Sequence, residues 1–421
     1  MESVNPLLTI PFIALLAAIA VAPFINRHWW EKNYPVVSTS LGGIVVAYYL
    51  FILGNVPRVL LTLHEYVSFI VLIGSLFIVS GGIHFQLKGK AEPVSNVAIL
   101  AFGALISNLV GTTGASMLLI RPYIRVNKFR IKPFHIIFFI FIVSNVGGAL
   151  TPIGDPPLFL GYLKGIPFFW VVENTWTMWG VAIGLLLAVF YFIDRRSFHH
   201  ESKVKQREAI EQHEHASFDG LANLGYLLAI LVGVFIEHPF GAREAIMCAA
   251  AAGSYFTTSK RIHEKNDFNF EPIKEVAILF LGIFATMMPA LDWLQANARL
   301  LGVTEPGHYY WASGALSSFL DNAPTYLNFL TASFGYFNLT IDDAQQVAQF
   351  LAVHARYVQA ISIGAVFFGA CTYIGNGPNF MVKSIAEQSG VRMPSFFGYI
   401  VRYTLPVLIP IYTLIWFLFF R

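Results

Sequence analysis

Long apolar runs separated by short polar segments dominate the chain. Ten of these runs have the roughly 20 residues that a helix needs to cross a bilayer. They lie near 6–26, 35–56, 66–86, 133–163, 175–194, 220–237, 241–258, 273–293, 346–387 and 397–420. The pattern therefore predicts an all-α polytopic membrane protein with about ten transmembrane helices.

Two further apolar segments, 94–120 and 308–335, are too long for one span and too short for two. Each has a polar centre, "SNLVGTTGAS" in the first and "FLDNAPTYLN" in the second. Basic residues flank the first segment on both sides, as they would if the chain entered the membrane and returned. Irregular backbone is tolerated at that depth only where protein or water surrounds it. We therefore expect two re-entrant hairpins.

Two of the predicted spans, 133–163 and 346–387, are interrupted by helix breakers, which makes them broken helices. Their interruptions read "GALTPIGDPPLF" at 148–159 and "GACTYIGNGPNF" at 369–380, and seven of the twelve positions are identical. Four of the seven matches are two glycines, a proline and a threonine, which chance similarity between apolar segments would not align, so they indicate an internal repeat.

The repeat divides the chain into residues 1–194 and 220–421, joined by the polar linker 195–219. Each half holds five spans and one hairpin. Because five is odd and a hairpin crosses nothing, the second half enters the membrane from the opposite face. This arrangement is an inverted repeat, in which matched breaks point to the binding site.

Charge sets the expected orientation. Only 12% of the residues are charged, and 21 of the 27 lysines and arginines fall on one side of this topology. The positive-inside rule then places the linker in the cytoplasm and both termini outside. We expect an integral protein of a bacterial-type inner (plasma) membrane.

A broken helix exposes carbonyls and two half-helix ends. C-terminal ends attract cations and N-terminal ends attract anions. The expected hinge residues are Gly148, Gly154, Pro156, Pro157, Gly375, Gly377 and Pro378. The alternative is a pair of proline kinks that only shape the bundle.

Hard oxygen donors gather at the hairpins and breaks, with no sulfur or imidazole among them. Such a set suits Na⁺ and not a transition metal. The predicted cation- and proton-binding residues are Asp155, Asp321, Asn108, Thr112, Thr151, Asn322, Thr325, Thr372 and Asn376. Further transport-site candidates are Ser107, Thr113, Ser144, Asn145, Asn379 and Arg356.

Asp155 and Asp321 are the intramembrane acids, and such costly residues are candidates for function. One carboxylate binds either H⁺ or Na⁺, and this mutual exclusion is the minimal chemistry of exchange. The alternative is that each aspartate caps a half-helix. Arg356 leaves three interpretations open: it reaches the outer surface, pairs with an acid or holds an anionic substrate.

These motifs resemble the ion transporter superfamily of NhaD-type Na⁺/H⁺ antiporters, arsenite pumps, citrate carriers and divalent anion–sodium symporters. The string "SNVGGALTPIGDPP" is most similar to the NhaD-type branch and to a neighbouring citrate-transporter group. The resemblance implies a scaffold part, an elevator-like transport part, Na⁺ sites at the hairpin tips and a homodimer. Neither tip keeps a contiguous Ser-Asn-Thr, which argues against dicarboxylate recognition of the symporter kind.

The favoured function is Na⁺/H⁺ antiport through Asp155 and Asp321. The alternative is a Na⁺- or H⁺-coupled citrate or dicarboxylate transporter, and efflux of arsenite or another small solute ranks below both. We find no nucleotide-binding motif, and no nucleophile–base pair or metal cluster that a membrane enzyme would need. The expected partners are small ions, an organic anion and the lipid bilayer, with no cofactor beyond the transported ions and no nucleic acid.

Overall fold

The structure, a computed structural model, describes residues 5–86, 91–200, 217–236 and 238–421. Within these ranges the regular structure is helical apart from two strands of three residues each. Eight described helical stretches are long and apolar enough to cross a membrane, and 133–148 and 222–233 are shorter apolar ones. The predicted all-α polytopic membrane protein is confirmed.

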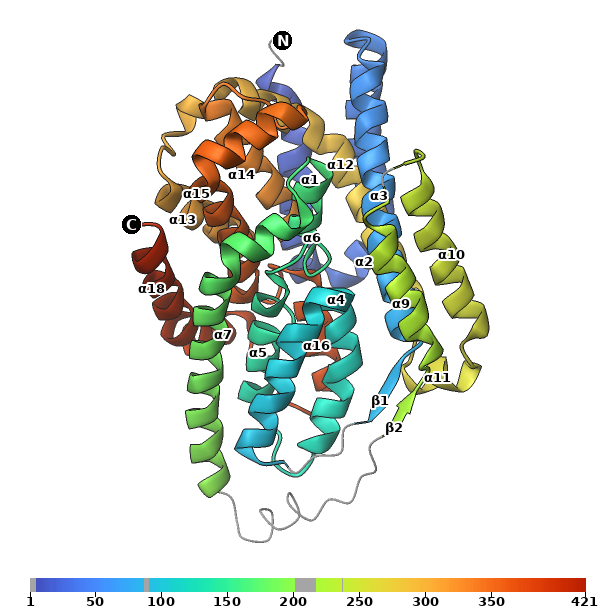
Figure 1. Cartoon of the computed structure of the whole chain (residues 1–421), viewed down its shortest axis with the longest axis vertical. Coiled ribbons are helices and arrows are strands. Elements are labelled where there is room, and N and C mark those ends of the chain that lie inside the picture. The colour runs from blue at the N-terminus through green and yellow to red at the C-terminus, as the bar shows by residue number, and fades with distance from the viewer. Residues whose placement is uncertain (1–4, 87–90, 201–216, 237) are drawn as a thin grey trace.

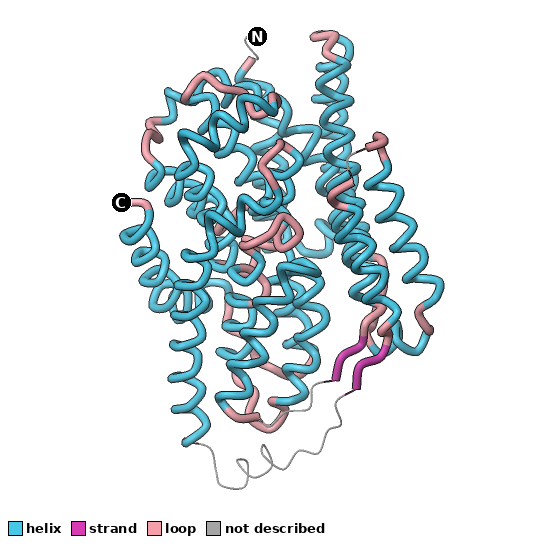
Figure 2. Tube along the Cα trace, in the orientation of Figure 1, coloured by secondary structure: helices cyan, strands magenta, loops and turns pink. Residues whose placement is uncertain are grey.

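The first half of the chain contains α1 (Ile10–Ile25), α2 (Arg27–Ala47), α3 (Val56–Gly81), α4 (Pro93–Val126), α5 (Pro133–Ile142), α6 (Pro156–Leu163), α7 (Phe168–His199) and the strand β1 (His84–Gln86). The second half contains β2 (Ser217–Asp219), α9 (Ala222–Gly233), α10 (Ala242–Thr257), α11 (Lys260–Lys265), α12 (Glu271–Asn297), α13 (Pro306–Ser317), α14 (Asn322–Tyr336), α15 (Ala344–Phe368), α16 (Gly377–Gln388), α17 (Phe396–Tyr399) and α18 (Ile409–Phe419). The strands pair antiparallel and join the two halves near the linker (Figure 2).

Helix α4 is a hairpin rather than a rod. Asn96 near its start and Asn127 just after its end exchange side-chain hydrogen bonds of 2.9 and 2.8 Å. A straight helix of this length would separate them by about 50 Å. The chain reverses at Gly111, whose φ of 76° lies where side chains are disfavoured.

Helices α13 and α14 form the second hairpin, with the turn at 318–321. Tyr309 on α13 faces Phe329 on α14, with ring centroids 6.3 Å apart, as two antiparallel arms require. Figure 1 shows α4 in the lower part of the molecule and α14 in the upper part.

Apart from one short 3₁₀ turn in each, at Val146–Gly148 and Gly369–Cys371, both long interruptions are irregular backbone in the middle of the molecule (Figure 2). The first runs from the end of α5 at Ile142 to Pro156, the first residue of α6, and the second runs from Phe368 to Gly377. Proline in the first turn suits each restart, because that position needs no backbone donor. Every side chain of α5 from Phe134 to Ile142 is buried, so the first break lies deep in the protein.

The predicted limits differ most from the structure at one span. Residues 66–86 were expected to cross, but α3 begins at Val56 and β1 occupies 84–86. The predicted start at residue 66 left Arg58 and Glu65 in the loop before the span. Tertiary ion pairs, Arg58 Nη2 to Asp292 at 2.8 Å and Lys164 Nζ to Glu65 at 2.7 Å, neutralise both charges inside the helix instead.

Candidate functional site

Asp155 is the centre of the polar interior, and its side chain is fully buried. Thr112 Oγ1 donates to its Oδ1 at 2.8 Å, and Asn376 Nδ2 donates to the same oxygen at 3.1 Å. Asn322 Nδ2 donates to its Oδ2 at 2.6 Å. The carboxylate is therefore held by both hairpins and by the opposite break.

Each of these four residues stands at the start of a helical segment. Asp155 precedes α6, Asn376 precedes α16, and Asn322 opens α14. Thr112 follows the turn at Gly111 and opens the second arm of α4. Four positive half-helix ends thus converge on one carboxylate, and such ends stabilise a negative charge. The Asp155 side chain makes no capping hydrogen bond to the N-terminus of α6.

Asp321 has a different role. Its Oδ1 accepts the backbone N–H of Ala323 at 3.0 Å and so caps α14, and its backbone carbonyl accepts Thr325 Oγ1 at 2.9 Å. Among the described contacts it makes no hydrogen bond with Asp155. The capping interpretation holds for Asp321 and fails for Asp155, so the two acids are not equivalent.

Each hairpin tip is bound to the break of its own half. Thr151 Oγ1 donates to the carbonyl of Asn108 at 2.7 Å, and Asn108 Nδ2 donates to the carbonyl of Gly147 at 2.7 Å. In the second half Thr372 Oγ1 donates to the carbonyl of Ser318 at 2.5 Å, and Ser318 Oγ donates to that of Phe368 at 3.3 Å.

These bonds correct the expected alignment of the hairpins. By sequence, Asn108 corresponds to Asn322, since they precede Gly148 and Gly369 by 40 and 47 residues. In the structure the counterpart of Asn108 is Ser318, and that of Thr112 is Asn322. The breaks align at an offset of 221 and the hairpin tips at 210, because the loops between them differ in length. No sequence pattern marks Ser318, because it lies just before the polar string "FLDNAPTYLN".

The glycines of the breaks let two backbone segments touch. A Cβ on Gly154 would overlap the carbonyl oxygen of Gly148, and one on Gly375 would lie 2.6 Å from that of Gly369. Gly377 is different, because a Cβ there would meet nothing within 4 Å. Pro156, Pro157 and Pro378 occupy the first turns of α6 and α16.

The other predicted site residues lie around this centre. Ser107 donates to its own helix, at the carbonyls of Gly103 and Ala104. Ser144 Oγ lies 2.7 Å from Ser116 Oγ, a residue that the sequence did not single out. Thr113 and Thr112 line a cavity of about 30 Å³ between the first tip, the first break and α3. This is room for about one water molecule.

Arg356 lies away from the centre. Its side chain is exposed, and Nη2 donates to the carbonyl of Phe419 at 2.7 Å, near the end of α18. The structure thus favours the surface interpretation, and no described contact joins Arg356 to Asp155 or Asp321.

An ion network that the sequence did not predict links α3 to the hairpin-bearing elements. Lys164, just after α6, pairs with Glu65 at 2.7 Å and Asp342 at 2.5 Å. Arg58 pairs with Asp342 at 3.1 Å and with Asp292 at 2.8 Å. Burial raises the pKa of Asp342, but the cations of Lys164 and Arg58 outweigh burial and hold that pKa below its usual value.

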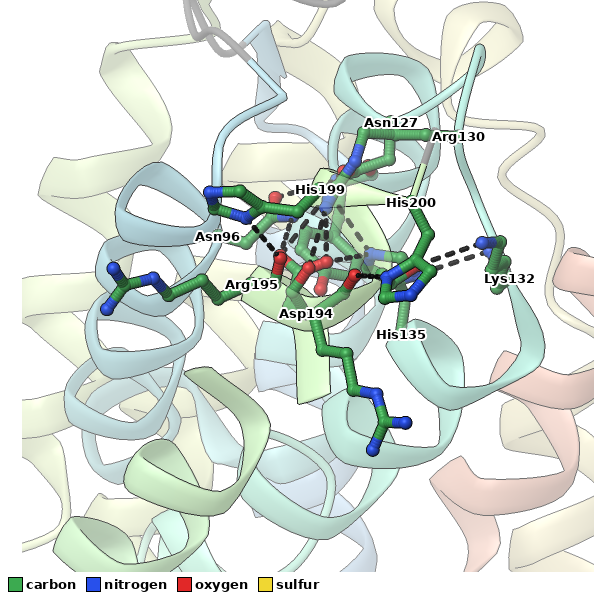
Figure 3. Close-up of polar contacts among 12 residues, drawn as sticks. Asn96, Asn127, Arg130, Lys132, His135, Asp194, Arg195, His199 and His200 are labelled. Atoms are coloured by element: carbon green, nitrogen blue, oxygen red, sulfur yellow. Dashed lines mark hydrogen bonds and ion pairs between the residues drawn. The ribbon is translucent and has the colours of Figure 1, made fainter. Parts of the chain in front are cut away.

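A second polar cluster closes the base of the α4 hairpin (Figure 3). The Asp194 carboxylate, at the end of α7, pairs with the Arg130 guanidinium and with His135 Nε2 at 3.0 Å, and it accepts Asn96 Nδ2 at 2.9 Å. His135 Nδ1 accepts the backbone N–H of Lys132 at 3.1 Å, so Nε2 carries the proton toward Asp194. Asp194 and its partners Arg130, His135 and Asn96 are all buried.

Two histidines of the polar linker lie at the end of α7. His199 and His200 each contact a carbonyl of their own helix at 2.7 Å, those of Arg195 and Arg196. His213 and His215 lie outside the described residues.

The fold and this buried polar centre define a helical membrane transporter. The family model described as "Putative citrate transport" matches residues 1–420, and the chain belongs to that family. No curated protein matches the chain.

Proposed function

We propose that the chain is a cation-coupled secondary transporter in which Na⁺ and H⁺ compete for Asp155. One observation carries the proposal: Asp155 is fully buried, and its described hydrogen-bond partners Thr112, Asn322 and Asn376 are all neutral. A buried carboxylate without a cationic partner is costly, and a bound cation or proton removes that cost.

The donors around Asp155 also serve a cation. Thr112 carries a hydroxyl oxygen, and Asn322 and Asn376 carry amide oxygens beside the nitrogens that now face the carboxylate. Rotation of these groups offers hard oxygen ligands of the type that Na⁺ prefers. A cavity of about 30 Å³ lies beside Thr112, and its lining includes Gly154 and Pro156, the chain neighbours of Asp155. Because one carboxylate binds one cation at a time, binding of Na⁺ displaces the proton. A transporter that carries the two ions in opposite directions through this competition is a Na⁺/H⁺ antiporter.

The hairpin-bearing elements are proposed to move together in an elevator-like step. Both tips and both breaks are joined through Asp155, so the site travels as a body. The ion pairs of Lys164 and Asp342 connect these moving elements to Glu65 and Arg58 on α3, which we assign to the scaffold part. A homodimer, and both termini outside the cytoplasm, remain predictions of the sequence.

Citrate, carried together with Na⁺ or H⁺, is the second candidate, and family membership favours it. The four helix N-termini at the centre are the kind of site that binds carboxylates. The negative charge of citrate would repel the ionised Asp155 carboxylate there. A like-charge pair at about 4 Å costs about 4 kcal/mol at an effective dielectric of 20. Citrate would therefore require the cation.

Purified protein in liposomes with an internal pH dye separates these functions. Na⁺ alone, citrate alone and both together are added to vesicles that hold a pH gradient, with wild type and Asp155→Asn compared. Antiport predicts that Na⁺ alone dissipates the gradient in wild type only. Citrate symport predicts that Na⁺ alone has no effect and that citrate with Na⁺ moves charge or protons. That second result rejects the antiport proposal.

A further inference from the structure

Asn145 holds a buried oxygen whose partner is missing. Its side chain is fully buried in the first break, and Oδ1 makes no hydrogen bond. The amide orientation is determined by its neighbours, since Nδ2 donates to the carbonyl of Ile140 at 2.8 Å and to Asn379 Oδ1 at 2.7 Å.

Asn379 is fixed in the same way. Its Nδ2 donates to the carbonyls of Gly369 and Thr372, at 2.8 and 2.9 Å, and neither carbonyl can donate. Asn379 must therefore present its oxygen to Asn145, and Asn145 must present its own oxygen elsewhere. A buried polar atom left in this way marks a place for an ion or a water molecule.

The free oxygen faces Gly369 in the opposite break. The position of a Cβ on Gly369 would be 3.0 Å from Asn145 Oδ1 and 3.2 Å from the carbonyl oxygen of Gly375. Two oxygens from different breaks thus lie close to the Gly369 backbone, and both distances are shorter than an ordinary contact with a Cβ. Backbone strain does not require glycine here, since its φ of −52° is helical.

Helix polarity gives an independent indication of the charge that this place favours. Asn145 follows the C-terminal end of α5 at Ile142, and Gly369 follows that of α15 at Phe368. Each C-terminal end carries a partial negative charge, equivalent to about half an electron. The N-terminal ends meet at Asp155 instead, so the two loci have opposite electrostatic character.

We propose that Asn145 Oδ1, with the carbonyl of Gly375, forms a second Na⁺ position beside Gly369, separate from the Asp155 carboxylate. This inference rests on the proposed cation coupling and adds a site to it. All the groups named are neutral oxygens, which suits a monovalent hard cation. Asn376 links the two positions, because its Nδ2 donates both to Asp155 and to the carbonyl of Ser144, at 3.1 and 3.2 Å.

Radioactive ²²Na⁺ binding to the purified full-length protein, with choline chloride balancing ionic strength, counts the sites. We expect two Na⁺ per protomer in wild type and one in Gly369→Ala, whose methyl group would press against Asn145 Oδ1 at 3.0 Å and displace it. The matched control is Gly377→Ala in the same break, where the methyl group meets nothing, and it should bind two. Asp155→Asn should lose the other site and bind one.

Asn145→Ala gives a second test if Gly369→Ala does not fold, as judged by thermal unfolding in detergent. It removes the oxygen without adding volume, and we expect one Na⁺ per protomer. If both variants bind as wild type does while Asp155→Asn loses binding, the second position is rejected and the proposed function stands. If wild type binds no Na⁺, both proposals are rejected.

Discussion

Asn376 donates from Nδ2 to Asp155 Oδ1 at 3.1 Å, although the two residues are 221 positions apart and occupy equivalent places in the two breaks. One half of the repeat supplies the acid and the other supplies its neutral counterpart. A symmetric pair of aspartates here would place two like charges in hydrogen-bond contact, which favours only one of them being ionised. The substitution of Asn for Asp thus leaves a single carboxylate at the centre.

Asp155→Asn and Asp321→Asn should differ in transport. Removing the Asp155 carboxylate should reduce Na⁺-driven proton flux in liposomes to the level of empty vesicles. Asp321→Asn should keep most of the flux, because Asn caps a helix about as well as Asp, with a cost well below 1 kcal/mol. Equal loss in both variants would return Asp321 to the ion-binding centre.

Gly375→Ala should disturb the second break. Its methyl group would lie 2.6 Å from the Gly369 carbonyl, and such overpacking costs about 1–3 kcal/mol. We expect a lower midpoint of thermal unfolding in detergent and slower transport. Gly377→Ala, two residues away and with open space, is the control and should match wild type. Wild-type stability of Gly375→Ala would show that the Gly375 and Gly369 segments of the second break can move apart at no cost.

Asp194→Asn should destabilise the base of the α4 hairpin. The Arg130 guanidinium would lose its buried counter-ion, and breaking a buried pair costs about 3–5 kcal/mol. Glu31→Gln is the comparison, since Glu31 pairs with Arg27 on the surface, where such pairs contribute about 0–1 kcal/mol. Thermal unfolding measures both, and similar small shifts would contradict a structural role for the cluster.

The network at Asp342 should depend on pH with a defined sign. Because Lys164 and Arg58 hold the pKa of Asp342 below its usual value, its contribution to stability is present above the pKa of the unfolded state, about 3.9. It is lost as the pH falls through the lower folded-state value. The stability difference between wild type and Asp342→Asn should therefore shrink below about pH 4. A difference that stays constant down to pH 3 would contradict the pairing.

Cysteine labelling tests the orientation. With exposed Cys248 replaced by serine, a His200→Cys variant places a thiol at the end of α7. The charge bias predicts that an impermeant maleimide reaches it only after the membrane is opened. Labelling of this thiol in intact cells would show that the topology is the opposite of the predicted one, and that each hairpin enters from the other side.

Local pattern alone was enough for the class of fold, both interruptions and most of the polar centre. Apolar runs of membrane length have few alternatives to helices, and glycine and proline end helices by local geometry, so 148–157 and 369–378 are readable directly. Asp155, Thr112, Asn322 and Asn376 were all among the predicted residues. Their types and positions identify them because polar groups at such depth are rare.

Only the tertiary structure decided which of these groups meet. It gave Asp155 three donors and reduced Asp321 to a helix cap, although both are acids beside a polar tip. It matched Thr112 with Asn322, placed Arg356 at the surface and brought Lys164 to Glu65 and Asp342. Apart from the local cap at Asp321, these relations join residues about 40 to 220 positions apart. Their geometry depends on how the two halves pack, which no local pattern encodes.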